Sequence, residues 1–188
     1  MKITYQIEFF NEWHCGSGLA AGADVDALVI KDKDNLPFVP GKTIKGLVRE
    51  AMENLISLAG DNEKEQLFFD TFGYFDTKTE MVKGTAFFAN AELSDSEKQA
   101  IKSGELAEYL YRNIASTAID DEGIAQKGSL RKIEVAVPCK LNGTILGVPD
   151  ELAALVCDAL KFIKRLGQNR NRGLGRCSFT VLKKEEEK

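Results

Sequence analysis

The sequence predicts a single α+β domain of 188 residues with a ferredoxin-like core, in the order β-α-β-β-α-β. Three patterns predict it. Residues 2–10 and 133–141 alternate apolar and polar side chains, as half-buried strands do. Residues 42–58 and 150–163 repeat apolar side chains at helical spacing. A further strand at 177–182 closes the order.

The remaining segments are assigned in chain order. Residues 11–24 are rich in small side chains and predict a loop, and residues 26–31 predict a short strand. A second helix is expected at 62–71, a strand at 83–93 and a charged helix at 94–112. The strand at 83–93 supplies the second strand of the core. The sheet of such a core is also the platform of RRM-type RNA-binding domains, but the fold alone does not establish a function.

Three features lie outside this regular pattern. Residues 113–130 contain many turn formers and little periodicity, which predicts a projecting loop or hairpin. Asp150 follows Pro149 and is expected to cap the last helix. Residues 183–188 form a charged tail.

The charges are unevenly distributed along the chain. The sequence has 25 Lys and Arg against 29 Asp and Glu, and this net charge of −4 argues against a general nucleic-acid coat protein. Residues 161–176, however, contain basic side chains and no acidic one. These are Lys161, Lys164, Arg165, Arg170, Arg172 and Arg176. A clustered charge of this kind matters more for binding a polyanion than the net charge does.

Several classes of protein are disfavoured. Four cysteines without C-x-x-C spacing and one histidine make a structural zinc site improbable. The first residues alternate instead of forming the apolar run of a signal peptide. No segment reaches the ~18–20 apolar residues that span a bilayer. We therefore expect a cytoplasmic protein.

A glycine-started helix is the first candidate binding element. Gly41 follows a proline, and Lys42, Lys45 and Arg49 recur at spacings of three and four, which places the three cations on one helical face. A helix N-terminus also presents unpaired N–H groups that suit a phosphate. The same pattern fits a solvated helix surface preceded by a Pro-Gly turn.

A second basic element lies near the C-terminus. The segment 167–176 contains Gly173 and Gly175 beside Arg170, Arg172 and Arg176. Glycines allow backbone amides to face a ligand, and arginines can bind phosphates with two hydrogen bonds. Most glycine-rich loops simply turn the chain. Because both elements occur together, we expect them to converge on one sugar-phosphate track of an RNA.

Three blocks of the sequence resemble RAMP-superfamily proteins of type III CRISPR effector complexes, in particular the repeated backbone subunit of the Csm and Cmr complexes. The first block is Leu36-Pro37-Phe38-Val39-Pro40-Gly41-Lys42-Thr43-Ile44-Lys45-Gly46, preceded by Asp26 and an apolar segment and followed by Arg49. The others lie at 118–135 and at 173–176. Two departures stand out: Lys42-Thr43 replaces the usual Ser-Ser, and Asp121 replaces a frequent arginine.

The resemblance implies a subunit that holds CRISPR RNA in a basic groove and assembles with other effector subunits and with copies of itself. It also implies that residues 113–131 form a thumb. This thumb inserts into the duplex that the guide forms with a single-stranded target RNA. The expected RNA-binding residues are Gly41, Lys42, Thr43, Lys45, Arg49, Arg131, Arg170, Arg172, Gly173, Gly175, Arg176 and His14.

Cleavage of target RNA is the activity that the resemblance implies for some members. Asp26 matches the aspartate that cuts RNA with a divalent metal, here Mg²⁺ or Mn²⁺. Asp24 is a second candidate ligand or a rival for the same role. Both aspartates also fit ordinary turn chemistry.

Two other functions stay open. The chain can be a non-catalytic RNA-binding scaffold in which Asp26 only orders its loop. It can also be a guide-processing endoribonuclease that uses His14, although a loop histidine that packs or touches RNA is the simpler interpretation.

Overall fold

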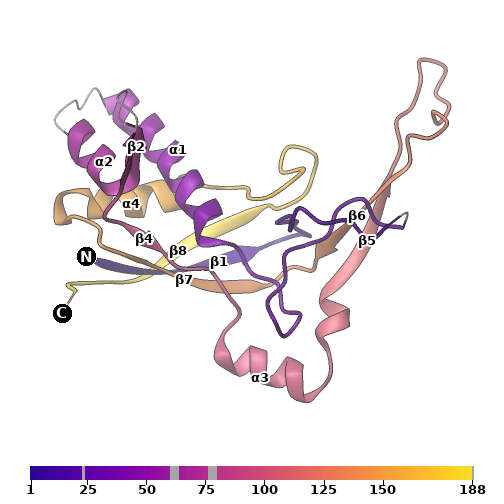
Figure 1. Cartoon of the computed structure of the whole chain (residues 1–188), viewed down its shortest axis with the longest axis horizontal. Helices are drawn as coiled ribbons and strands as arrows, with labels where there is room; N and C mark the ends of the chain where they lie inside the picture. The colour runs from indigo at the N-terminus through magenta and orange to yellow at the C-terminus, as the bar shows by residue number, and fades with distance from the viewer. Residues whose placement is uncertain (23, 60–63, 76–79, 188) are drawn as a thin grey trace.

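The core of the protein is a four-stranded antiparallel sheet with two helices on one face (Figure 1). The computed structural model describes residues 1–22, 24–59, 64–75 and 80–187. The sheet has the order β4-β7-β1-β8, and the chain visits the core as β1-α1-β4-β7-α4-β8. The bounds are β1 Lys2–Phe9, α1 Gly41–Ala59, β4 Phe87–Phe88, β7 Lys140–Leu146, α4 Asp150–Phe162 and β8 Cys177–Glu185. The predicted ferredoxin-like arrangement is confirmed.

The alternation of β1 is the clearest link between sequence and core. Ile3, Tyr5, Ile7 and Phe9 are buried, whereas the residues between them are only half-buried on the other face of the sheet. The helices bury the stripes expected from their periodicity, including Ile44, Val48, Leu152, Val156 and Leu160. Burial of apolar surface on one face of the sheet therefore holds the helices in place.

The other elements extend from this core at its two ends. Helix α2 (Glu65–Phe72) and strands β2 (Gly73–Phe75) and β3 (Met81–Lys83) lie at one end. At the opposite end projects the hairpin of β5 (Tyr111–Ser116) and β6 (Arg131–Ala136), and its far part is the segment predicted to project (Figure 1). Helix α3 (Asp95–Ser103) and a 3₁₀ turn (Ala107–Leu110) lead into the hairpin.

One predicted strand is in fact two. The alternation at 133–141 was expected to form a continuous strand, but β6 ends at Ala136 and β7 begins at Lys140 in a different sheet. Pro138 lies in the break, and proline has no N–H to continue a ladder. The same alternating run therefore serves both the hairpin and the core.

Other expected elements are shorter than predicted. The strand expected at 83–93 is a regular strand only at Phe87–Phe88. Beyond the start of α1 it meets β7 again through an isolated bridge between Glu92 and Asn142. The segment 26–31 is not a regular strand, because its isolated bridges go to three different segments of the chain. The helix expected at 94–112 ends at Ser103, where Gly104 follows.

Termini of elements also differ from the predictions. The last helix begins after Pro149, and Asp150 lies in its first turn without a side-chain capping bond. The charged tail expected at 183–188 is partly strand, since β8 pairs with β1 as far as Glu185. Of the helix expected at 62–71, residues 62 and 63 fall outside the described residues. No described helix is long and apolar enough to cross a membrane.

Candidate nucleic-acid interface

The glycine at the start of α1 serves packing, not a ligand. The Gly41 N–H donates to Asn90 Oδ1 at 2.9 Å. A Cβ at Gly41 would collide with the carbonyl oxygen of Phe88, and the residue is buried. The prediction that Gly41 lets a phosphate approach is therefore wrong, because the β4 segment occupies that space. Thr43, next along the helix, is half-buried, and its N–H donates to Pro40.

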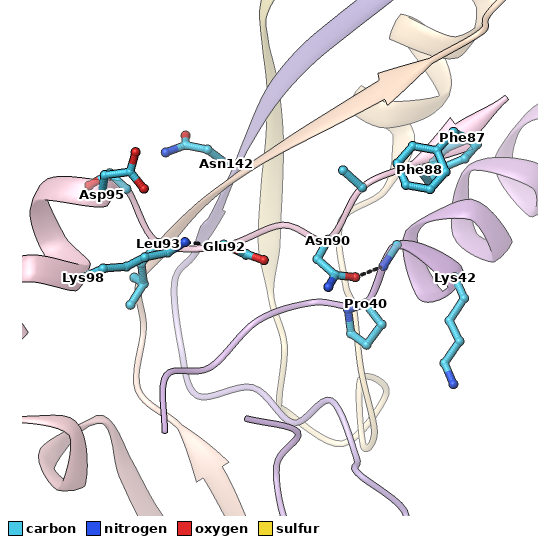
Figure 2. Close-up of a pocket in the computed structure, with 13 residues that line it drawn as sticks. Pro40, Lys42, Phe87, Phe88, Asn90, Glu92, Leu93, Asp95, Lys98 and Asn142 are labelled. Carbon is cyan, nitrogen blue, oxygen red and sulfur yellow. Dashed lines mark hydrogen bonds and ion pairs between the residues drawn. The ribbon is translucent and has the colours of Figure 1, made fainter. Parts of the chain in front are cut away.

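A cavity of about 960 Å³ adjoins this helix end, between β4, β7 and the start of α3 (Figure 2). Polar side chains of its wall already have partners: Lys98 pairs with Glu92 at 2.5 Å, and Asn142 accepts from Gln6, outside the wall, at 3.1 Å. Lys42 is exposed at its rim and has no ion-pair partner within the described part of the chain. Lys42 is thus the group of this wall that remains available to an anion.

The three cations of α1 do not form one surface. Lys45 and Arg49 line a different cleft, against β2 and β3. Arg49 donates to the Gly73 carbonyl at 3.1 Å and pairs with Glu53 at 2.9 Å, so it anchors α1 to β2. Partial burial, together with the charge of Arg49, lowers the pKa of Lys45. The single cationic face predicted from spacing is therefore divided, because only Lys42 faces away from β2 and β3.

The loop of residues 167–176 is held rigidly by backbone contacts with the chain that follows β1. Gln168 N–H donates to the His14 carbonyl at 2.8 Å, and Gly175 N–H donates to the Glu12 carbonyl at 2.7 Å. Asn11 accepts from Arg176 N–H at 2.8 Å. These bonds fix the course of the loop.

The two glycines predicted to face RNA play different roles. At Gly175 a Cβ would collide with the Leu166 carbonyl oxygen, so this glycine permits close packing within the loop. Gly173 has a φ of +95° and open space where a Cβ would stand, although its carbonyl accepts from the Asn11 side chain. Only Gly173 is therefore placed where a ligand can approach the backbone.

The arginines of the loop are also divided. Arg172 and Arg176 are exposed, and neither has a carboxylate partner among the residues that the structure describes. The guanidinium of Arg176 lies 5.9 Å from the ring of Phe10, which is itself exposed. Arg170 instead lies 3.9 Å from Glu50 of α1 and lines a hollow of about 280 Å³ there. The loop and α1 thus lie on the same side of the molecule, as expected, but they meet in the middle of the helix.

Asp26 is tied to the base of the hairpin. Its N–H donates to the Lys132 carbonyl at 2.8 Å, and its Oδ2 accepts from Lys132 N–H at 2.7 Å. Arg131, exposed and without an acidic partner in the described chain, precedes Lys132. Asp24 is exposed, and within the described residues its backbone N–H donates to the Ala21 carbonyl at 3.3 Å. The geometry fixes Asp26 firmly and leaves one of its carboxylate oxygens open.

The described residues contain no group of three or more His, Cys, Asp or Glu side chains that could hold a metal ion. Mg²⁺ in nucleotide sites is commonly held by one or two carboxylates together with phosphate and water. Asp26 fits such a site only as one protein ligand of an ion that RNA also binds.

His14 is buried, which the sequence did not reveal. Its Nδ1 lies 2.6 Å from the Glu134 carbonyl oxygen, and its Nε2 is enclosed without a hydrogen-bond partner in the described chain. The expected RNA contact of His14 is therefore wrong for this conformation, since no solvent reaches the ring. Catalytic proton transfer by His14 would also require RNA or water to reach the ring, which is buried.

Glu134 is the residue that sequence reasoning missed. Its carboxylate accepts from Val29 N–H at 3.0 Å and from the Lys31 ammonium at 2.7 Å. Lys31 Nζ also lies 3.9 Å above the ring of Tyr111 on β5. The sequence signal for this role was a single acidic residue that lies between apolar residues of an alternating strand. Glu134 joins the loop that carries Asp26 to both strands of the hairpin.

Comparison with known families then decides the class of protein. A model of the RAMP superfamily matches residues 6–178. The chain belongs to the RAMP superfamily. A comparison with curated proteins gave no match.

Solved structures resemble this RAMP chain along its whole length. A chain in the cryo-EM structure of the type III-B Cmr-β complex bound to cognate target RNA superimposes with a TM-score of 0.69, at 11% identity, covering 96% of this chain and 97% of that one. A chain of the apo Cmr-β structure gives 0.68 at 12% identity, covering 97% and 98%. At this identity the likeness shows a shared fold.

In this RAMP domain the cations predicted to bind RNA separate by their partners. Arg49 holds α1 to β2 through its bond to the Gly73 carbonyl and pairs with Glu53 within the helix, and Arg170 holds the loop to α1 through its ion pair with Glu50. Lys42, Arg172 and Arg176 are exposed without such partners in the described residues. This second group, with Arg131 beside Asp26, is the candidate RNA interface.

Proposed function

We propose that this chain is an RNA-binding subunit of a type III CRISPR effector complex. One observation carries the proposal: Arg172 and Arg176 project from a loop fixed by backbone bonds and have no carboxylate partner among the described residues. In a chain with more acids than bases, unpaired arginines on a rigid loop suit an external polyanion. Membership of the RAMP superfamily and the fold shared with Cmr-β chains support the same setting.

The RNA track proposed here passes the exposed cations on the hairpin side of the helical layer. It joins Arg172, Arg176 and Gly173 of the loop to Arg131 at the hairpin base, with Lys42 at the start of α1. Single-stranded RNA held this way would bring a phosphate toward Asp26, which lies beside Arg131 and Lys132. Lys45 and Arg49 are not part of this track because they face β2 and β3.

Binding is tested by reversing the loop charges. Arg172→Glu with Arg176→Glu should weaken binding of a guide-length RNA and lower the slope of log K against log salt by about 1.4, since each phosphate contact to a single strand contributes about 0.7. Lys161→Glu with Lys184→Glu, two exposed lysines on α4 and β8, makes the same change in net charge, and this matched control should leave the slope nearly unchanged. Equal effects of the two variants would contradict the proposed track.

We further propose that Asp26 participates in metal-dependent cleavage of target RNA. A divalent ion such as Mg²⁺ or Mn²⁺, bound by Asp26 and an RNA phosphate, would neutralise charge that develops on the scissile phosphodiester. The chain itself supplies a carboxylate held in place by Lys132 and flanking cations that position the RNA.

A scaffold without catalysis is the second candidate function, because one Asp26 oxygen already serves to bond the loop to β6. The assay is cleavage of complementary RNA by the assembled complex. Asp26→Asn should abolish cleavage and retain RNA binding, whereas Asp121→Asn at the hairpin tip should retain both. Absence of cleavage by the wild-type complex with Mg²⁺ and Mn²⁺ would favour the scaffold, and cleavage in EDTA that His14→Ala removes would favour the histidine mechanism.

A further inference from the structure

Phe10, the residue that follows β1, is an exposed aromatic side chain beside a cation. It is 52% exposed, although the preceding Phe9 is buried and stacks on the buried Trp13 at 4.4 Å between ring centroids. The Arg176 guanidinium lies 5.9 Å from the centre of the Phe10 ring. Packing in the core therefore accounts for Phe9 and Trp13 but not for Phe10.

This pair differs from the other contacts between a cation and an aromatic ring in the described chain. Lys31 lies over Tyr111, which is half-buried, and Arg49 lies over Phe68, which is buried. Those two rings pack within the fold, and their cations also have a carboxylate partner. The cation beside Phe10 has no such partner among the described residues. Within that part of the chain, only the Phe10 pair therefore leaves both a ring and a charge for an external ligand.

Hydrogen bonds hold the backbone at Phe10 against the loop of residues 167–176. The Phe10 N–H donates to the Arg176 carbonyl at 2.9 Å. The Asn11 Oδ1 accepts from the Arg176 N–H at 2.8 Å, and the Asn11 amide nitrogen donates to the Gly173 carbonyl. The end of β1 and the loop are thus fixed relative to each other before a ligand binds, which lowers the entropy lost on binding.

The exposed groups at this place match the parts of a nucleotide. A nucleobase has a flat π face that stacks on an aromatic ring, and the phosphate of a nucleotide binds arginine. Phe10 offers the ring, while Arg172 and Arg176 offer the charges. A protein segment that covered Phe10 would also have to neutralise these two arginines, since a buried charge without a partner is costly. The combination therefore favours a nucleic acid over an apolar protein surface.

We propose that Phe10 stacks against one base of the bound RNA, next to the phosphate contacts of Arg172 and Arg176. The inference rests on the proposed function, and it adds a base contact to a track that otherwise consists of charges. Both ends of the Asn11 amide are bonded, to Arg176 and to Gly173, so this neighbouring polar group is not offered to the edge of a base. The contact should therefore accept any base, as stacking platforms do.

Replacement of Phe10 tests the stacking. Phe10→Ala should weaken binding of the full chain to an oligouridylate of guide length by roughly 5- to 150-fold, the usual range for one stacked base. Fluorescence anisotropy of the labelled RNA measures this change. Phe10→Trp should retain the affinity, whereas Phe10→Leu keeps apolar area without a π face and should not. Phe75→Ala removes another exposed phenylalanine, on β2, and this matched control should bind like the wild type.

The salt dependence of binding separates stacking from a merely supporting role. Phe10 is neutral, so Phe10→Ala should leave the slope of log K against log salt unchanged, whereas Arg172→Glu with Arg176→Glu should lower it. If Phe10 only held the Arg176 guanidinium in place, Phe10→Ala would lower the slope as well. That result would overturn the proposal.

An RNA chain without bases gives the sharpest test. An abasic oligomer has the ribose-phosphate chain and the charge of the oligouridylate but no base to stack. The wild type should bind the oligouridylate more tightly than the abasic oligomer, and Phe10→Ala should bind the abasic oligomer as tightly as the wild type does. An equal loss of affinity for both oligomers would contradict the stacking, because Phe10 would then contact no base.

The same samples distinguish this inference from the proposed function. RNA binding by the wild type that Phe10→Ala leaves unchanged would contradict the stacking alone. Absence of RNA binding by the wild type would contradict the proposed function, and the stacking with it. If Phe10→Ala kept the RNA affinity but weakened association with another protein of the complex, the ring would be a protein contact and the proposal wrong. Circular dichroism checks that each variant is folded.

Discussion

Glu134 should be the polar residue whose loss most weakens the hairpin base. The side chain is 13% exposed and accepts both the Val29 N–H, at 3.0 Å, and the Lys31 ammonium, at 2.7 Å. Glu134→Ala leaves a buried N–H without an acceptor, which costs about 1–3 kcal/mol. The ion pair adds only about 1 kcal/mol, because Lys31 remains 28% exposed and water screens its charge. We expect a loss of about 2–4 kcal/mol in the free energy of unfolding.

Glu134→Gln separates the two contributions. The amide oxygen can still accept from Val29, so only the ion pair is lost and about 1 kcal/mol of stability with it. Lys31→Met should cost a similar amount, and the double variant should cost little more than either single change. Glu122→Gln, on the exposed hairpin tip, is the control and should change stability by less than about 0.5 kcal/mol.

Urea unfolding followed by tryptophan fluorescence is the assay. Trp13 is the only tryptophan in the chain, is fully buried, and donates to the Val137 carbonyl at 3.1 Å beside the hairpin base. Its emission therefore reports on the region that Glu134 holds together. If Glu134→Ala unfolded within about 0.5 kcal/mol of the wild type, or matched Glu134→Gln, the assigned bonds would not stabilise this junction.

The remaining predictions concern packing and pH. Gly143→Ala should cost about 1–3 kcal/mol of stability, because a Cβ there would collide with the buried ring of Tyr5, and thermal unfolding measures the loss. Gly46→Ala, in open space on α1, should instead stabilise by about 0.5–1 kcal/mol, and a loss there would contradict the packing argument. Burial raises the pKa of the Cys15 and Cys177 thiols to about 12, so their contribution to stability is complete below the ordinary thiol pKa near 9 and falls as pH rises toward 12. Each thiol should remove about 1.4 kcal/mol per pH unit in that window, and thiolate absorbance at 240 nm that appears below pH 10 in a folded Cys139→Ser, Cys157→Ser variant would contradict it.

Local patterns predicted the core well because each pattern is complete within one segment. The alternation of Ile3, Tyr5 and Ile7 and the stripe that includes Ile44 and Val48 already state which face is buried. Pro138 shows the limit of such patterns. The alternation runs through it, and only the pairing partners reveal that β6 and β7 belong to different sheets.

The candidate site was predicted less completely, since each of its residues depends on a distant neighbour. Spacing placed Lys42, Lys45 and Arg49 on one helical face. In the structure, however, Lys45 and Arg49 line the cleft against β2 and β3. The close approach of the Phe88 carbonyl, and not a bound phosphate, explains why residue 41 is a glycine. His14 stands in a polar, glycine-rich stretch, yet Glu134 and the loop at 167–176 enclose it.

By itself the sequence determined the order of the core elements, the RAMP resemblance and the position of an arginine-rich loop, because periodicity, motifs and composition are local properties. Only the tertiary structure decided which glycines serve packing, which arginines are already paired and which acid holds the hairpin base. Those roles depend on atoms that are far apart in the chain, such as Arg49 and Gly73, 24 residues apart, or Asn11 and Arg176, 165 residues apart, and folding alone brings these atoms into contact.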